Sequence, residues 1–112
     1  MNIQSFIQTV KHLFQDSFNP AETMQWLTID KNIFWSWGVS KTINLANKGL
    51  LLRVNGHHHN GYVLITLSFN DTYSVHLIKT NGKLISTTED IYCDQLQDFI
   101  DEKIERIAEY VD

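Results

Sequence analysis

Residues 61–79 read GYVLITLSFNDTYSVHLIK, and this stretch decides the fold. Apolar side chains recur at every second position in residues 62–69, which is the period of a half-buried β-strand. The alternation resumes in residues 73–79, after Asn70-Asp71, a pair that tolerates left-handed backbone. The pattern predicts a β-hairpin. On its first strand, the side chains expected to face the core are Val63, Ile65, Leu67 and Phe69.

Similar signals extend this hairpin into a larger sheet. Asn81-Gly82 suits a type I′ turn, because both central residues of that turn need a positive φ, and it predicts a second hairpin into residues 84–85. Upstream, residues 50–55 alternate and lead through a Gly-flanked turn into Tyr62. Residues 33–38 alternate aromatic and small side chains, which predicts a first strand, whereas residues 39–49 fit neither period and are expected to be a loop. The sequence therefore predicts an antiparallel meander of four to five strands.

Helical periodicity appears at both ends of the chain. A first helix is expected to begin near Asn2 and to present the apolar residues Ile3, Phe6, Ile7, Val10, Leu13, Phe14 and Phe18. Asn19-Pro20-Ala21-Glu22 combines a cap, a first-turn proline and a carboxylate, and predicts a short helix that ends near Leu27. A C-terminal helix of about 20 residues is expected after a capping box at Thr87 and Asp90. Its apolar stripe consists of Tyr92, Leu96, Phe99, Ile100, Ile104, Ile107 and Val111.

Length and composition fit one α+β domain that spans residues 1–112. A chain of this size buries roughly two thirds of its unfolded surface, and 43% hydrophobic residues with a single proline are typical of a folded protein. The lone Cys93 excludes an internal disulfide. No apolar run reaches the roughly 20 residues that cross a bilayer, and the N-terminal residues lack the apolar core of a signal peptide. We therefore expect a cytoplasmic protein.

The charge is strongly asymmetric. Residues 89–112 hold nine acidic residues against Lys103 and Arg106, a net charge of −7, while the other 88 residues carry +3. On a helical wheel, carboxylates gather opposite the apolar stripe of the C-terminal helix. A solvated surface explains such a stripe, and so does a docking face for a basic partner. Its members are Asp94, Asp98, Asp101, Glu102, Glu105 and Glu109.

A second candidate surface is basic and aromatic. Aromatic rings beside Lys and Arg on a sheet face would stack single-stranded bases and hold the phosphates. The residues proposed for this role are Trp35, Trp37, Lys41, Arg53 and Lys79. The alternative is that the tryptophans fill the core.

The insert Gly56-His57-His58-His59-Asn60-Gly61 raises the question of a metal site. Imidazole is a common ligand of Zn, Cu and Ni, and His57 and His59 point the same way in an extended chain. Two ligands do not make a closed site, and the insert contains no Cys, Asp or Glu. A polar turn is the preferred interpretation, so no metal or other cofactor is expected.

No constellation predicts catalysis. Ser36 lies between two tryptophans without the strained turn that normally exposes a nucleophilic serine, and Cys93 falls in an apolar sector. The chain contains no phosphate-binding loop and no dinucleotide-binding glycine pattern. A non-enzymatic protein is therefore expected.

Four segments carry a resemblance to a class of small proteins. Residues 33–38 (IFWSWG), 56–63 (GHHHNGYV), 71–75 (DTYSV) and 94–98 (DQLQD) resemble small proteins of bacterial mobile elements, including anti-CRISPR inhibitors of RNA-targeting type VI effectors. The likeness covers roughly residues 33–107 and assigns no catalytic residue. It implies an acidic, non-catalytic inhibitor whose partner is a CRISPR effector nuclease with its guide RNA. The alternatives are a single-stranded nucleic-acid binder and a His-cluster metal protein.

Overall fold

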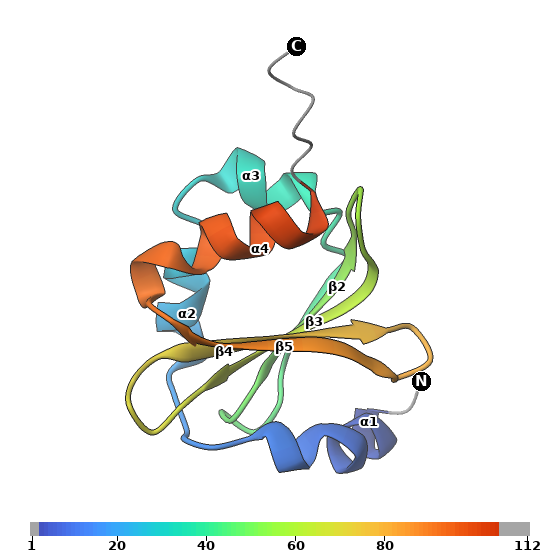
Figure 1. Ribbon diagram of the computed structural model, residues 1–112, viewed down its shortest axis with the longest axis vertical. Coiled ribbons are helices and arrows are strands. Elements are labelled where there is room, and N and C mark those ends of the chain that lie inside the picture. Colours follow the sequence, from blue (N-terminus) through green and yellow to red (C-terminus); the bar gives the residue numbers. More distant parts are fainter. Residues whose placement is uncertain (1–2, 106–112) are drawn as a thin grey trace.

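The structure is a computed structural model that describes residues 3–105, and its centre is a five-stranded antiparallel sheet in the order β1-β2-β3-β4-β5 (Figure 1). This meander confirms the predicted α+β architecture. The strands are β1 (Lys41–Asn44), β2 (Leu50–Asn55), β3 (Asn60–Leu67), β4 (Tyr73–Lys79) and β5 (Leu84–Ile91). The helices are α1 (Ile3–Val10), α2 (Pro20–Leu27), α3 (Lys31–Ser36) and α4 (Leu96–Ile104), with the 3-10 turns η1 (Lys11–Leu13) and η2 (Cys93–Gln95).

Both hairpins form, but the predicted type I′ turn at Asn81-Gly82 is wrong, because only Gly82 and not Asn81 has a positive φ. Asp71 adopts a φ of 66° between β3 and β4, and Gly82 adopts a φ of 91° between β4 and β5. The register of the central hairpin places Val63 opposite Leu77 and Leu67 opposite Tyr73. Residues with a small energetic penalty for left-handed backbone therefore stand where the chain reverses.

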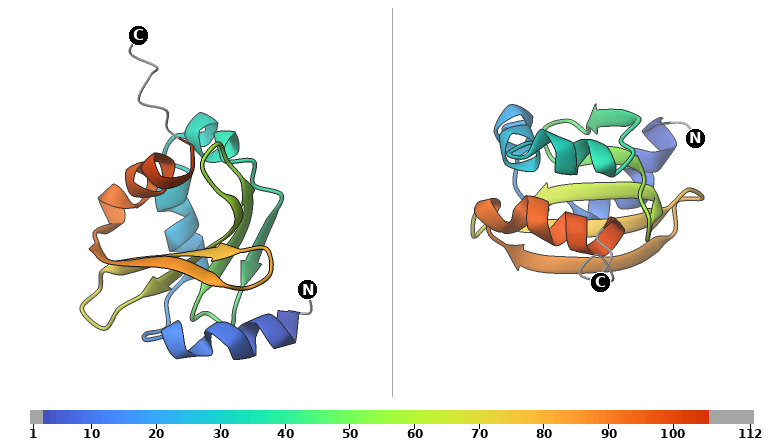
Figure 2. Two further views of the ribbon diagram at one scale, coloured as in Figure 1. Left: turned by 45° about the vertical axis from the view of Figure 1, so that its right-hand side comes forward. Right: turned by 90° about the horizontal axis from the view of Figure 1, so that it is seen from above.

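Helices cover both faces of the sheet, so the molecule has three layers (Figures 1 and 2). The larger core lies beneath α2, α3 and α4 and contains Val63 and Ile65, as predicted. Leu64, which points to the opposite face, is also fully buried, because α1 covers that face with Phe6 and Val10. A strand with two buried faces appears as a nearly continuous apolar run, and β3 has this pattern.

Two face assignments on β3 need correction. Phe69 was expected in the core, but β3 ends at Leu67, and the Phe69 ring in the following turn is 74% exposed. Thr66 and Ser68 alternate with the residues expected in the core and so were expected on the half-buried strand's outer face, yet both are buried. The chain that follows η1 passes along the end of β3, where Asp16 forms an antiparallel β-bridge with Leu67.

The prediction of a strand at residues 33–38 is wrong. Most of these residues belong to α3, which begins at Lys31. The preceding residue Asp30 caps it, because its carboxylate accepts hydrogen bonds from the backbone N–H groups of Asn32 (2.9 Å) and Ile33 (3.3 Å). An Asp cap satisfies backbone groups that a helix start leaves free, and this local gain outweighs the strand preference of the aromatics. The first strand instead lies in residues 41–44, within the predicted loop.

The start of the C-terminal helix was also placed too early. Thr87 and Asp90 belong to β5 and form no helix cap, since Asp90 takes a φ of 61° where the β4–β5 register shifts. Helix α4 begins only at Leu96, after η2, and ends at Ile104. The expected apolar positions Ile107 and Val111 lie outside the described residues.

The N-terminal predictions are closer to the structure. Helix α1 buries Phe6 and Val10, and the helical stretch ends at Leu13, five residues before the expected limit at Phe18. Helix α2 begins at Pro20 with Asn19 as its cap, because the Asn19 side-chain oxygen accepts a hydrogen bond from the Ala21 N–H at 2.9 Å. Within residues 3–105, no helix has the length and apolar character needed to cross a membrane.

Candidate partner-binding groove

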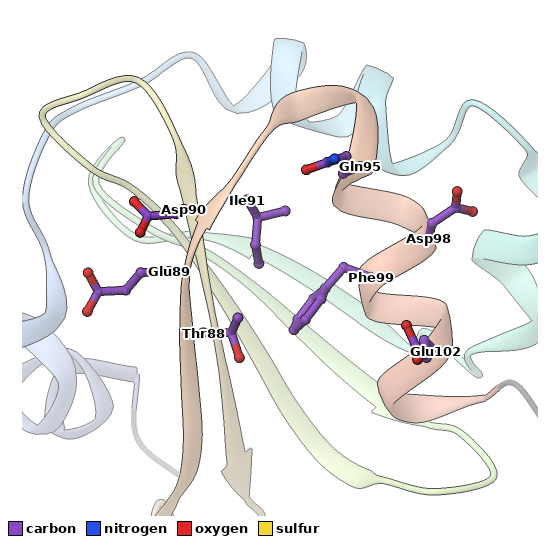
Figure 3. A pocket seen from close by; sticks show the side chains of 8 residues that line it. All are labelled: Thr88, Glu89, Asp90, Ile91, Gln95, Asp98, Phe99 and Glu102. Carbon is purple, nitrogen blue, oxygen red and sulfur yellow. The ribbon is translucent and has the colours of Figure 1, made fainter.

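A hollow of about 380 Å³ lies between the edge strand β5 and helix α4 (Figure 3). Phe99 reaches from α4 toward the strand, where Ile91 and Thr88 lie between the two elements. Carboxylates stand at the outer rims of the hollow, where Glu89 and Asp90 point away from α4 and Asp98 points away from the strand (Figure 3). We call this site the acidic groove; it is lined by Thr88, Glu89, Asp90, Ile91, Gln95, Asp98, Phe99 and Glu102.

Local folding brings the two walls together. The chain leaves β5 at Ile91, turns through η2, and returns beside the strand as α4. The side-chain oxygen of Gln95 lies 3.4 Å from the Tyr92 backbone N–H, which it caps at the turn. Because Leu96, Ile100 and Ile104 are fully buried, the 3.6-residue period leaves Asp98 and Glu102 exposed on the outer side of the helix.

Two features of the lining suit a cation. Glu89, Asp90, Asp98 and Glu102 are all exposed carboxylates. The half-buried Phe99 ring also holds a cation, since the Lys103 Nζ atom lies 5.6 Å from the ring centroid. A basic side chain from a partner would therefore meet negative charge at the rim and an aromatic surface between the walls.

The structure divides the carboxylate stripe that the sequence predicted. Asp94, Asp98 and Glu102 are exposed as expected. Asp101 is only 9% exposed and accepts a hydrogen bond from the buried Trp37 Nε1–H at 3.0 Å, so the prediction that it lies on the docking face is wrong. Glu105 is half-buried and accepts the His57 backbone N–H at 2.7 Å. Glu109 lies outside the described residues.

Two groove residues, Glu89 and Asp90, were missing from the predicted site. The expected helix start near residue 87 placed them at the beginning of a helix instead of on the strand that faces it. The available signal was the run of residues 84–88, which contains β-branched Ile85, Thr87 and Thr88 and continues the strand beyond residue 85.

The predicted basic and aromatic face does not form. Trp37 is fully buried under α4, while Trp35 on α3 is 63% exposed. Arg53 is occupied by the backbone oxygens of Val54 and Gly61 and by the Asn60 side chain, the last at 2.8 Å. Lys41 on the edge strand β1 is paired with Arg53, so these two side chains lie on the same face of the sheet. Lys79 is paired with Gly61, and both lie on the opposite face.

The histidine insert forms the β2–β3 turn and holds the end of α4. The His58 backbone N–H donates to the Ile104 carbonyl at 2.7 Å, so the turn caps the helix C-terminus. His57 and His58 are exposed with their rings 4.9 Å apart, but His59 is buried and its Nε2 lies 3.0 Å from the Tyr62 carbonyl. Among residues 3–105, no group of three or more His, Cys, Asp or Glu side chains is placed to hold a metal ion.

Ser36 and His76 are both engaged in hydrogen bonds within the fold. The Ser36 hydroxyl donates to the Ile33 carbonyl at 2.6 Å. His76 is buried between two hydroxyls, with Nε2 2.9 Å from Thr66 Oγ1 and Nδ1 2.9 Å from Thr87 Oγ1. Burial lowers the pKa of His76 to about 4, with a further contribution from nearby His12, so this ring is neutral at pH 7.

Comparison with protein families, with curated proteins and with solved structures found no significant match to this chain.

Proposed function

We propose that this protein acts by binding, and that the acidic groove docks on a basic surface of a nucleic-acid-handling enzyme. The observation that carries the proposal is the presence of Glu89 and Asp90 on β5 and of Asp98 and Glu102 on α4 around the rim of one hollow. Complementary charge speeds encounter and selects against wrong partners.

The chemistry of the groove suits Lys and Arg side chains. The methylene stem of such a side chain would pack against Phe99 and Ile91, while its charged head would meet the rim carboxylates. Enzymes that hold RNA or DNA carry these residues in their nucleic-acid channels, since the phosphate backbone supplies most of the attraction. A protein that fills such a channel competes directly with the nucleic acid.

The sequence resemblance supplies the class of partner. Anti-CRISPR proteins of mobile elements work by binding, and the resembling segment 94–98 includes Asp98 of the groove wall. We propose an inhibitor of an RNA-targeting type VI effector that acts in the cytoplasm on the effector with its guide RNA.

Target-RNA cleavage by a purified type VI effector with guide RNA tests the proposal. Stoichiometric protein is expected to suppress cleavage, and the charge reversal Glu89→Lys/Glu102→Lys is expected to restore it. Both positions are exposed, so the variant should keep the wild-type circular dichroism spectrum and thermal midpoint. Undiminished cleavage with wild-type protein, or a mobility shift of free RNA by the protein alone, would contradict the proposal.

A further inference from the structure

The outer edge of β5 is an open side of the sheet. Within residues 3–105, β5 has a single neighbouring strand, β4, and it forms the border of the sheet in the view from above (Figure 2). Every second residue of β5 therefore directs its backbone N–H and C=O groups away from the sheet, where no strand pairs with them. The opposite edge strand, β1, has four residues, whereas β5 has eight and contains none of the Lys or Pro residues that protect many exposed edges.

The centre of β5 is regular enough to receive a further strand. Residues 86–88 pair with residues 75–77 of β4 in unbroken register, between the two register shifts of this strand pair. Two of the three central residues are β-branched threonines, which favour contacts across neighbouring strands. Leu84 and Ile85 at the beginning of β5 are 41% and 49% exposed. The open edge therefore offers both backbone groups and apolar surface.

Carboxylates lie on both faces of this edge. Consecutive side chains of a regular strand point to opposite faces, but Asp90 takes a φ of 61°, and Glu89 and Asp90 both point away from α4 (Figure 3). Glu102 lies on the other face, on α4 across the hollow. The side chains of an added strand would alternate between these two faces. Adjacent basic residues on such a strand would therefore meet carboxylates on both sides.

From the open edge and the carboxylates on its two faces we infer that β5 receives an extended basic segment of the partner as a further strand of the sheet. In strand addition, backbone hydrogen bonds give affinity and alternate side chains give specificity. Lys and Arg at adjacent positions match the charge of this edge, whereas a second copy of this chain, with its net charge of −4, would bring more carboxylates to it. The inference rests on the proposed docking at the acidic groove and specifies the form of the partner segment.

Two peptides of equal charge test whether the backbone of the occupant takes part. The probe is Val-Lys-Arg-Val-Lys-Arg-Val, and the control is the same peptide N-methylated at every internal residue, which removes the backbone donors along both of its edges. Affinities are measured by isothermal titration calorimetry. The unmodified peptide is expected to bind at least about tenfold more tightly, since it alone can complete the hydrogen bonds of an added strand. Equal affinities, or no binding of the unmodified peptide, would overturn the inference.

Amide hydrogen exchange locates the bound peptide. The unmodified peptide is expected to slow exchange at alternate residues of β5, because every second N–H group points to the open edge, and to leave exchange in β1 unchanged. Peptide binding without slower exchange in β5 would overturn strand addition. Slower exchange of the same amides at high protein concentration without peptide would overturn it in favour of a second copy at this edge.

Two charge variants test the match to a basic segment. Glu89→Gln/Glu102→Gln removes one exposed carboxylate from each face and is expected to weaken peptide binding about tenfold. The control Glu22→Gln/Asp71→Asn removes two exposed carboxylates away from β5 and should bind like the wild type, and Asn tolerates the positive φ of Asp71. Equal affinities of the two variants would refute the charge match.

The cleavage assay separates this inference from the proposed function. A protein that suppresses cleavage but gains no protection in β5 from the peptide would dock through side chains alone, which refutes strand addition and leaves the inhibition in place. A protein that gains this protection but does not suppress cleavage would refute the inhibition and leave the strand-addition site in place.

Discussion

Replacing Asp101 by Ala tests whether this residue holds the fold or meets a partner. Its carboxylate accepts the Nε1–H of the fully buried Trp37 at 3.0 Å, and the two residues join α4 to the C-terminal end of α3. Truncation to Ala leaves the indole N–H without this acceptor. Hydrogen bonds to charged groups contribute about 1.5 to 3 kcal/mol, and an orphaned buried donor has a cost of the same order.

We therefore expect Asp101→Ala to lower the free energy of unfolding by about 1.5 to 3 kcal/mol. For a chain of this length the midpoint of thermal unfolding should fall by roughly 5 to 15 °C. Urea unfolding followed by tryptophan fluorescence measures the free energy directly. The neighbouring Glu102→Ala is the control, because its exposed side chain should matter by less than about 0.5 kcal/mol. Equal stability of the two variants would refute the buried role of Asp101.

Three further predictions concern other parts of the fold. The pKa of His76 is about 4 in the folded protein and near 6.5 in the unfolded chain, so acid favours the unfolded state. The free energy of unfolding should therefore fall by up to about 3 kcal/mol between pH 6.5 and pH 4. Urea unfolding of His76→Gln over the same pH range should lack this part of the pH dependence. His59→Ser should lower the free energy of unfolding by about 1 kcal/mol, because a buried, hydrogen-bonded ring is lost. The double variant His57→Ser/His58→Ser should change the thermal midpoint little, since these residues bind α4 through their backbone N–H groups. Equal effects of the two variants would show that the insert acts as a uniform polar turn. Gly56→Ala would place a methyl group against the last carbonyl of α4, so it should speed amide hydrogen exchange in that helix, and unchanged exchange would contradict the contact.

Periodicity was sufficient for the elements whose pattern agrees with their local chemistry. The strands at residues 50–55 and 73–79 and the helix at 20–27 were predicted, and the strand predicted at 62–69 spans residues 60–67. In each case alternation or a cap coincided with turn residues at the ends. The prediction for residues 33–38 was wrong because their alternation suggests a strand, while the Asp30 cap favours a helix through two local hydrogen bonds. The spacing of apolar residues carries no information about such a cap.

The candidate site was predicted only on its helical side. The sequence identified Asp98 and Glu102, but it could not separate them from Asp101, since burial of Asp101 depends on Trp37, which lies 64 residues away in the chain. The strand side was missed because Thr87 and Asp90 were interpreted as a helix cap, whereas the positive φ of Asp90 lies within β5, which continues to Ile91. Long-range packing is outside what a local pattern encodes, and so is the left-handed backbone of Asp90, which no neighbouring turn signal marks.

The most direct test of the acidic groove compares two variants with the same net charge. Glu89→Gln/Asp98→Asn/Glu102→Gln removes three negative charges from the groove, and Gln8→Lys/Gln15→Lys/Gln25→Lys adds three positive charges at exposed positions elsewhere. Affinity for the effector with its guide RNA is measured for both at one ionic strength. We predict that the groove variant loses binding and that the charge-matched variant keeps an affinity close to wild type. Equal losses in both variants would show that overall charge, and not the groove between β5 and α4, drives association.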